Sequence, residues 1–165
     1  MTNLELVFPE IFLSLSIMFL LILGVFTHES SKLIQNLSLT TLLITAVITF
    51  NETLSIEEIL LFNDSVIIDY LSSFMKIVTL LAAFFVLVIS SSYLRTLKIF
   101  KIEYPVLILS SVLGMMVMIS SNDLIVFYMG LELQSLALYV LATFNRDQLK
   151  SSEAGLKYFV LSALS

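Results

Sequence analysis

The chain alternates long apolar stretches with short polar ones. Five stretches read as membrane-crossing helices, and a sixth begins before the last residue. They cover residues 6–26, 33–50, 70–92, 104–119, 124–144 and, incompletely, 152–165. An α-helix rises about 1.5 Å per residue, so about 20 residues cross the roughly 30 Å hydrocarbon core of a bilayer. The pattern therefore predicts an all-α, polytopic transmembrane bundle that forms a single integral membrane region.

The polar segments between the stretches predict how the helices begin and connect. Residues 121–123 carry side chains suited to cap the fifth helix, and residues 151–153 offer the same to the sixth. Residues 59–62 and 66–68 flank a polar triplet, and this spacing predicts a small β-hairpin outside the membrane. Residues 93–104 mix apolar and basic side chains, so we expect them to lie along the membrane interface.

Composition excludes most other classes of protein. Of the 165 residues, 59% are hydrophobic and 13% are charged, whereas soluble domains are about 45–50% apolar and about 25% charged. The chain has no cysteine and only one histidine, His28, so we expect no catalytic, cofactor-binding or metal site on it. The net charge of −5 argues against nucleic acid as a partner.

The charged residues outside the stretches predict the orientation. The first, third and fifth loops hold all of the loop cations, namely Lys32, Arg95, Lys98, Lys101, Arg146 and Lys150. The second loop is acidic instead, with Glu52, Glu57, Glu58, Asp64 and Asp69. Because basic loops stay on the inner side of a membrane, the N-terminus is predicted to face outward and the sixth helix to start from the inner side.

One acidic residue lies deep in a predicted span. Glu132 is about 12 Å beyond the start of the fifth stretch, and an ionisable residue near mid-membrane costs about 2.5–3.5 kcal/mol on insertion scales. A stripe of polar residues spaced for one helix face includes it: Tyr128, Glu132, Ser135, Tyr139 and Thr143. The stripe has two interpretations. It is a proton path with Glu132 as its titratable group, or Glu132 is a neutral, hydrogen-bonded acid that holds helices together.

Two lysines also fall inside predicted spans. Lys157 lies about 8 Å from the inner end of the sixth helix. Its charge either influences the proton path of Glu132, or its side chain extends back to the interface beside Glu153. Lys76 lies about 10 Å along the third helix and is either a further member of a polar path or a snorkelled or helix-bonded lysine. Glu10, near the outer end of the first stretch, is expected at the interface.

Two segments carry a family resemblance. DLIVFYMGLELQSLALYVL at 123–141 and SSEAGLKYFVLSA at 151–163 closely resemble chain 2 of proton-pumping NADH:ubiquinone oxidoreductase, respiratory complex I. The specific part is a glutamate inside GLELQSL followed by a lysine inside EAGLKYFVL. The segment DYLSSFMKIVTLL at 69–81 fits more loosely. The resemblance is thus to the antiporter-like membrane subunits of that complex.

The resemblance implies a role for each buried charge. Glu132 matches the family's essential membrane glutamate, Lys157 matches a lysine of the half-channel charge network, and Lys76 falls where relatives often carry a lysine. The implied function is a proton-translocation half-channel coupled to NADH oxidation by quinone, within an H⁺-translocating NADH:ubiquinone reductase. FMN, Fe–S clusters and quinone would be bound by other subunits. The alternatives are a structural or assembly subunit of the same membrane arm, or a cation/proton antiporter fragment.

The resemblance also implies partners and a location. The chain stops inside its sixth helix and lacks the family's seventh-helix lysine, so we expect a second polypeptide to supply the remaining helices. Other membrane-arm subunits and membrane lipids are the further partners. The many Ile, Leu, Phe, Ser and Asn residues and the absence of Trp suggest an AT-rich genome, and a gene divided in two is more expected in an organelle. We therefore expect the mitochondrial inner membrane, with the N-terminus toward the intermembrane space. The alternative is a bacterial plasma membrane.

Overall fold

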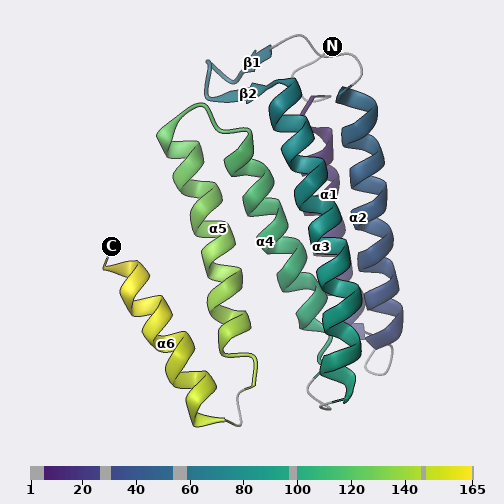
Figure 1. The fold of residues 1–165 in the computed structure, drawn as a ribbon, viewed down its shortest axis with the longest axis vertical. Coiled ribbons are helices and arrows are strands. Elements are labelled where there is room, and N and C mark those ends of the chain that lie inside the picture. Colours follow the sequence, from purple (N-terminus) through teal and green to yellow (C-terminus); the bar gives the residue numbers. More distant parts are fainter. Residues whose placement is uncertain (1–5, 27–30, 54–58, 97–99, 146–147, 165) are drawn as a thin grey trace.

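A computed structural model describes residues 6–26, 31–53, 59–96, 100–145 and 148–164 of the chain. Consecutive helices run in alternate directions through the bundle, and a short hairpin lies at one end (Figure 1). The elements are α1 (Phe8–Phe26), α2 (Ser31–Thr53), β1 (Ile59–Leu61), β2 (Val66–Ile68), α3 (Tyr70–Thr96), α4 (Glu103–Ile119), α5 (Leu124–Ala142) and α6 (Leu149–Ala163). The all-α class predicted from the sequence is confirmed.

Four of the described helices, α1, α2, α3 and α5, are long and apolar enough to cross a membrane, and α4 is a shorter apolar helix. In the most apolar window of these four, only 17–28% of the residues are buried. Much of the apolar surface therefore points outward, as expected for helices that lipid surrounds. The hydrophobic core lies among α1, α2, α3 and α4, where it includes Leu13, Leu20, Ile34, Leu80, Leu87, Leu109 and Met116.

Several helix ends differ from the predicted ones. α2 continues to Thr53, so Glu52 belongs to its last turn and not to a loop. α3 continues to Thr96 and α4 begins at Glu103, so residues 93–96 and 103–104 of the segment expected at the interface belong to these helices. α6 begins at Leu149, and the Ser151 hydroxyl donates to the Ala142 carbonyl oxygen (2.8 Å) instead of capping the helix.

The predicted hairpin and the predicted cap of α5 are both confirmed. β1 and β2 pair antiparallel, with Ile59 opposite Ile68. Asp123 has an extended backbone, and its carboxylate accepts the Ile125 N–H at 3.4 Å. The hairpin is fastened to the turn between α4 and α5, because the Ile67 N–H donates to the Ser120 carbonyl oxygen at 2.9 Å. It therefore covers one end of the bundle.

Two glycines allow α4 and α5 to approach each other closely. A Cβ at Gly114 would lie 2.6 Å from the Gln134 nitrogen and 2.7 Å from the Gly130 carbonyl oxygen. A Cβ at Gly130 would lie 2.9 Å from the Gly114 carbonyl oxygen. Because these neighbours are backbone atoms, they cannot move aside without moving a helix. The position of α5, which carries the polar stripe, thus depends on small residues at this crossing.

We predict that Gly114→Ala lowers the free energy of unfolding by about 1–3 kcal/mol, the usual cost of overpacking. The matched control is Gly24→Ala, whose Cβ would lie 2.8 Å from a side-chain methyl of Ile102 and not from backbone. Thermal unfolding of the detergent-solubilised protein measures both. An equal loss in the two variants would show that the glycine crossing is not special.

Candidate functional site

The five residues of the predicted stripe all lie on α5 or at its end, but their environments differ. Tyr128 is 58% exposed and Glu132 is partly buried, whereas Tyr139 is only 7% exposed. Ser135 and Thr143 are partly buried. The stripe therefore runs from an open half near the start of α5 to a covered half near its end.

The open half holds the acid. Tyr128 lies one helical turn before Glu132, and its hydroxyl interacts electrostatically with the Glu132 carboxylate. The Ser135 hydroxyl donates to the carbonyl oxygen of Leu131 on its own helix (2.7 Å), which leaves its oxygen able to accept a further hydrogen bond. Glu132 is thus near a tyrosine hydroxyl and remains partly accessible.

The covered half of the stripe fastens α6 to α5. The Tyr139 hydroxyl donates to the Ser162 hydroxyl oxygen, and the Tyr139 ring meets the Tyr158 ring edge-on at 4.8 Å between centroids. Thr143 packs against Gly155, where a Cβ would lie 2.0 Å from the Thr143 methyl carbon. Two of the five predicted path residues therefore also serve as packing contacts.

Lys157 does not lie on the face of α6 that meets α5. That face carries Ser151, Gly155, Tyr158, Phe159 and Ser162. The Lys157 ammonium nitrogen instead lies 2.5 Å from a carboxylate oxygen of Glu153, and the two side chains are 67% and 62% exposed. The structure therefore does not bring Lys157 together with Glu132, and it matches the alternative in which Lys157 sits beside Glu153.

Lys76 lies in a different part of the bundle from the stripe. Its ammonium nitrogen is 2.5 Å from a carboxylate oxygen of Glu10, which joins α3 to α1. The side chains are only 3% and 9% exposed, so the prediction of a snorkelled Lys76 was wrong, while the interfacial position of Glu10 stays a prediction. A buried charge is stable only when it is paired, and α1 supplies the partner. One hint could be read from the chain, because both residues lie near the predicted outer ends of their helices.

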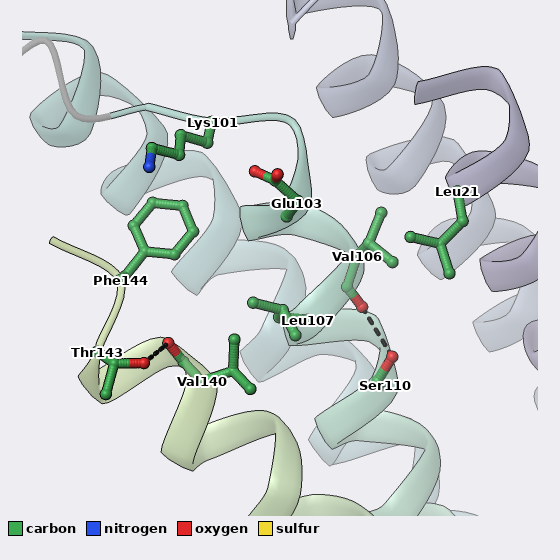
Figure 2. A pocket seen from close by; sticks show the side chains of 9 residues that line it. All are labelled: Leu21, Lys101, Glu103, Val106, Leu107, Ser110, Val140, Thr143 and Phe144. Atoms are coloured by element: carbon green, nitrogen blue, oxygen red, sulfur yellow. Dashed lines mark hydrogen bonds between the residues drawn. The ribbon is translucent and has the colours of Figure 1, made fainter. Parts of the chain in front are cut away.

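A cleft of about 240 Å³ opens beside the covered end of the stripe, between α1, α4 and α5 (Figure 2). Its walls are formed by Leu21, Lys101, Glu103, Val106, Leu107, Ser110, Val140, Thr143 and Phe144. Lys101 and Glu103 bring charge to it from the side that carries the basic loops. The Thr143 hydroxyl donates to the Val140 carbonyl oxygen at 3.0 Å, so its oxygen can accept from a water in the cleft. The cleft had no signal in the sequence, because its walls come from three helices.

Comparison with known proteins places these features in a family. The family described as "NADH:quinone oxidoreductase/Mrp antiporter, TM" matches residues 121–165. The chain is 68% identical over all of its length to NADH-quinone oxidoreductase subunit N of Pelagibacter ubique and 50% identical over 99% of its length to that of Maricaulis maris. The chain belongs to this family of antiporter-like membrane subunits. It spans about a third of the length of these relatives, 35% and 34% respectively.

A solved structure shares the fold. It is a chain of respiratory complex I from Thermus thermophilus with bound aureothin, with a TM-score of 0.75 and 23% identity over 94% of this chain and 33% of that one. The two chains thus share the fold of the helical bundle. The relatives named here are bacterial, so the expected mitochondrial location gains no support from them. His28, Glu57 and Glu58 lie outside the described residues.

The contact between α5 and α6 can be tested by cross-linking, because the chain has no cysteine of its own. A Cβ at position 155 would lie 3.2 Å from the Thr143 Cβ, close to the usual separation of about 3.5–4.5 Å in a disulfide. We predict that Thr143→Cys with Gly155→Cys forms a disulfide under mild oxidation. After proteolysis between the two helices, mass spectrometry would find the fragments joined.

The matched comparison is Glu132→Cys with Lys157→Cys. These are the two positions that the family resemblance assigns to one charge network. We predict little cross-linking, since Lys157 points away from the α5 contact. Equal cross-linking of both pairs would contradict this placement of α6.

Proposed function

We propose that this chain forms part of a core membrane-arm subunit of a proton-pumping NADH-quinone oxidoreductase. In this proposal it contributes part of a proton-translocation half-channel, and Glu132 is the group that takes up and releases the proton. The observation that carries the proposal is the position of Glu132. It is a partly buried acid in the middle of a candidate membrane span, in line with hydroxyl side chains.

The cleft is the proposed inner entrance. Thr143 lines it, and Glu132 lies eleven residues earlier on the same helix, which corresponds to about 16 Å. Tyr139 and Ser135 lie between them on the same face. Since the Ser135 and Thr143 hydroxyls donate to backbone carbonyls, their oxygens are oriented to accept hydrogen bonds from bridging water. Water and side-chain oxygens together would carry a proton from the cleft to the acid.

Lys157 is proposed to modulate Glu132 through its charge and not by direct contact. While Lys157 is paired with Glu153, the two charges largely cancel. Separation of this pair would leave a cation near the end of the stripe, and a nearby cation favours the ionised form of an acid. Loading and release of a proton would then follow the state of the Lys157–Glu153 pair.

The partners in this proposal follow from the family. The helices that correspond to the other two thirds of the relatives' length complete the half-channel, whichever polypeptide carries them. Other membrane-arm subunits and lipids surround the bundle, and other subunits bind FMN, Fe–S clusters and quinone. The bacterial relatives favour a plasma membrane, with the N-terminus on the outer side as the basic loops predict.

A structural role is the second candidate, because a specific observation favours it. Tyr139 and Thr143 hold α6 against α5, so part of the stripe is needed for packing whatever Glu132 does. In that case Glu132 would be a neutral acid that stabilises helix contacts. A stand-alone antiporter fragment is a third candidate. It would purify without a flavin- and Fe–S-containing arm, whereas the proposed subunit would purify with one.

We predict that Glu132→Gln reduces NADH-driven proton pumping while the complex still assembles and reduces quinone. A group that transfers protons contributes about 10²–10⁴ in rate, so pumping through this path should fall at least about tenfold. Proton uptake into vesicles during NADH oxidation measures this, and native gels measure assembly. Glu132→Asp, which keeps the carboxyl group, should restore part of the pumping.

The control is Asp64→Asn, which alters an exposed carboxylate in the turn of the hairpin and leaves the stripe and the Lys157–Glu153 pair intact. It should change pumping far less than Glu132→Gln. A normal ratio of protons pumped to NADH oxidised in Glu132→Gln would refute the proton-path proposal. If less complex assembles, and the complex that does assemble pumps the normal number of protons per NADH, the structural candidate would be supported.

A further inference from the structure

A chain of polar contacts joins α2 to α3 and ends in an arginine. The Gln35 side chain donates from Nε2 to the Ser91 hydroxyl oxygen (2.5 Å), and its Oε1 accepts from Arg95 Nη2 (2.6 Å). The Ser91 hydroxyl in turn donates to the Val88 carbonyl oxygen at 3.0 Å. Because each side chain is held by the next, these contacts fix the position of Arg95 at the end of α3.

The Phe100 ring contacts the same guanidinium. Arg95 Cζ lies 4.8 Å from the centre of the ring, a cation–π contact, and the arginine side chain is partly buried. Among the described residues the Gln35 oxygen accepts from one of its five N–H donors, so the others remain able to bind a ligand. An arginine that is already held in place loses little conformational freedom on binding, which favours affinity.

No carboxylate in the described ranges neutralises Arg95. The ion pairs in those ranges have Lys76 and Lys157 as their cations. A further cation, Lys32, is exposed and lies one turn before Gln35 on the same face of α2. It stands in the first turn of that helix, where the helix dipole favours an anion. The two helix ends thus carry two positive charges, and the described residues hold no counter-ion for them.

These cations lie at the level expected for lipid headgroups. The start of α2 and the end of α3 lie at the same end of the bundle, which the basic loops assign to the inner side (Figure 1). Tyr93 is 65% exposed there, and tyrosine is enriched at the headgroup level of membranes. Toward mid-membrane the surface is apolar, since Val88, two turns before Arg95 on the same face, is 41% exposed and Ile89 is 71% exposed. An acyl chain can lie along this part of α3 while its headgroup meets Arg95.

We propose that the inner ends of α2 and α3 form a binding site for an anionic phospholipid, whose phosphate pairs with Arg95 and Lys32. Charge complementarity supports this ligand, because a guanidinium binds phosphate oxygens through two parallel N–H groups and the inner leaflet supplies anionic lipid. A zwitterionic lipid has no net charge to balance the two cations, so the site prefers lipids with net negative charge. The site lies away from the stripe on α5 and does not depend on any role of Glu132.

Photo-labelling of the assembled complex in lipid vesicles tests the proposal. Phosphatidylglycerol and phosphatidylcholine, each with a photoreactive group in one acyl chain, are supplied separately, and mass spectrometry quantifies the label on residues 85–94 of α3. We expect phosphatidylglycerol to label this segment of wild type more strongly. Arg95→Gln should reduce the preference about fivefold, the usual effect of one cation near a membrane surface on the binding of anionic lipid.

Gln35→Glu is the sharpest variant, because it keeps the shape of the side chain and places a carboxylate where Oε1 accepts from Arg95. This internal counter-ion would take the place of the lipid phosphate, so we expect the preference to fall although Arg95 remains. The matched control is Lys150→Gln. It removes an exposed cation on the same side of the membrane, on α6 and away from α2 and α3, and should leave the preference unchanged.

Native gels establish that each variant assembles, so that labelling is compared between intact complexes. Equal labelling of wild type by the two lipids overturns the proposal, and so does a preference that survives both Arg95→Gln and Gln35→Glu. A preference that falls equally in Lys150→Gln overturns it too, because it would reflect only the general surface charge. If neither lipid labels the segment, another polypeptide covers it, and the proposal is overturned in favour of a protein carboxylate as the partner of Arg95.

Discussion

The cost of placing charge in an apolar bundle governs this structure. An ionisable side chain inside a membrane must be paired, neutral or in contact with water. Lys76 meets this condition by pairing with Glu10 across two helices, and Lys157 meets it by pairing with Glu153 one turn away. Glu132 lies near the Tyr128 hydroxyl and has no ion pair in the described part of the chain, so it is the charge that most needs water or a proton.

The helix that carries Glu132 is placed by packing and not by polar contacts. Gly114 and Gly130 let α4 and α5 meet at backbone distance, and Tyr139 and Thr143 hold α6 on the other side. Thr143 also borders the cleft that would admit water. One helix thus combines rigid placement with an accessible acid, which is what a proton site needs if its neighbours are to act on it reproducibly.

Much of the fold could be predicted from the sequence, because hydropathy, cap residues and turn residues act locally. The helices, the hairpin and the Asp123 cap followed from such signals. The ion pair of Glu10 and Lys76 could not be foreseen, since it joins residues 66 positions apart through the packing of α1 on α3. The glycine crossing and the cleft were missed for the same reason. The stripe was placed on one helix face as predicted, but its partnership with Lys157 stays a prediction.

The central claim is that Glu132 exchanges protons with water that reaches it along α5. The most direct measurement is a high-resolution map of the assembled complex in which ordered waters are visible. The account predicts waters that connect the Thr143 side of the cleft with the Glu132 carboxyl group, past Tyr139 and Ser135. A Glu132 side chain that faces lipid, or that is sealed in dry packing without water or a charged group nearby, would contradict it.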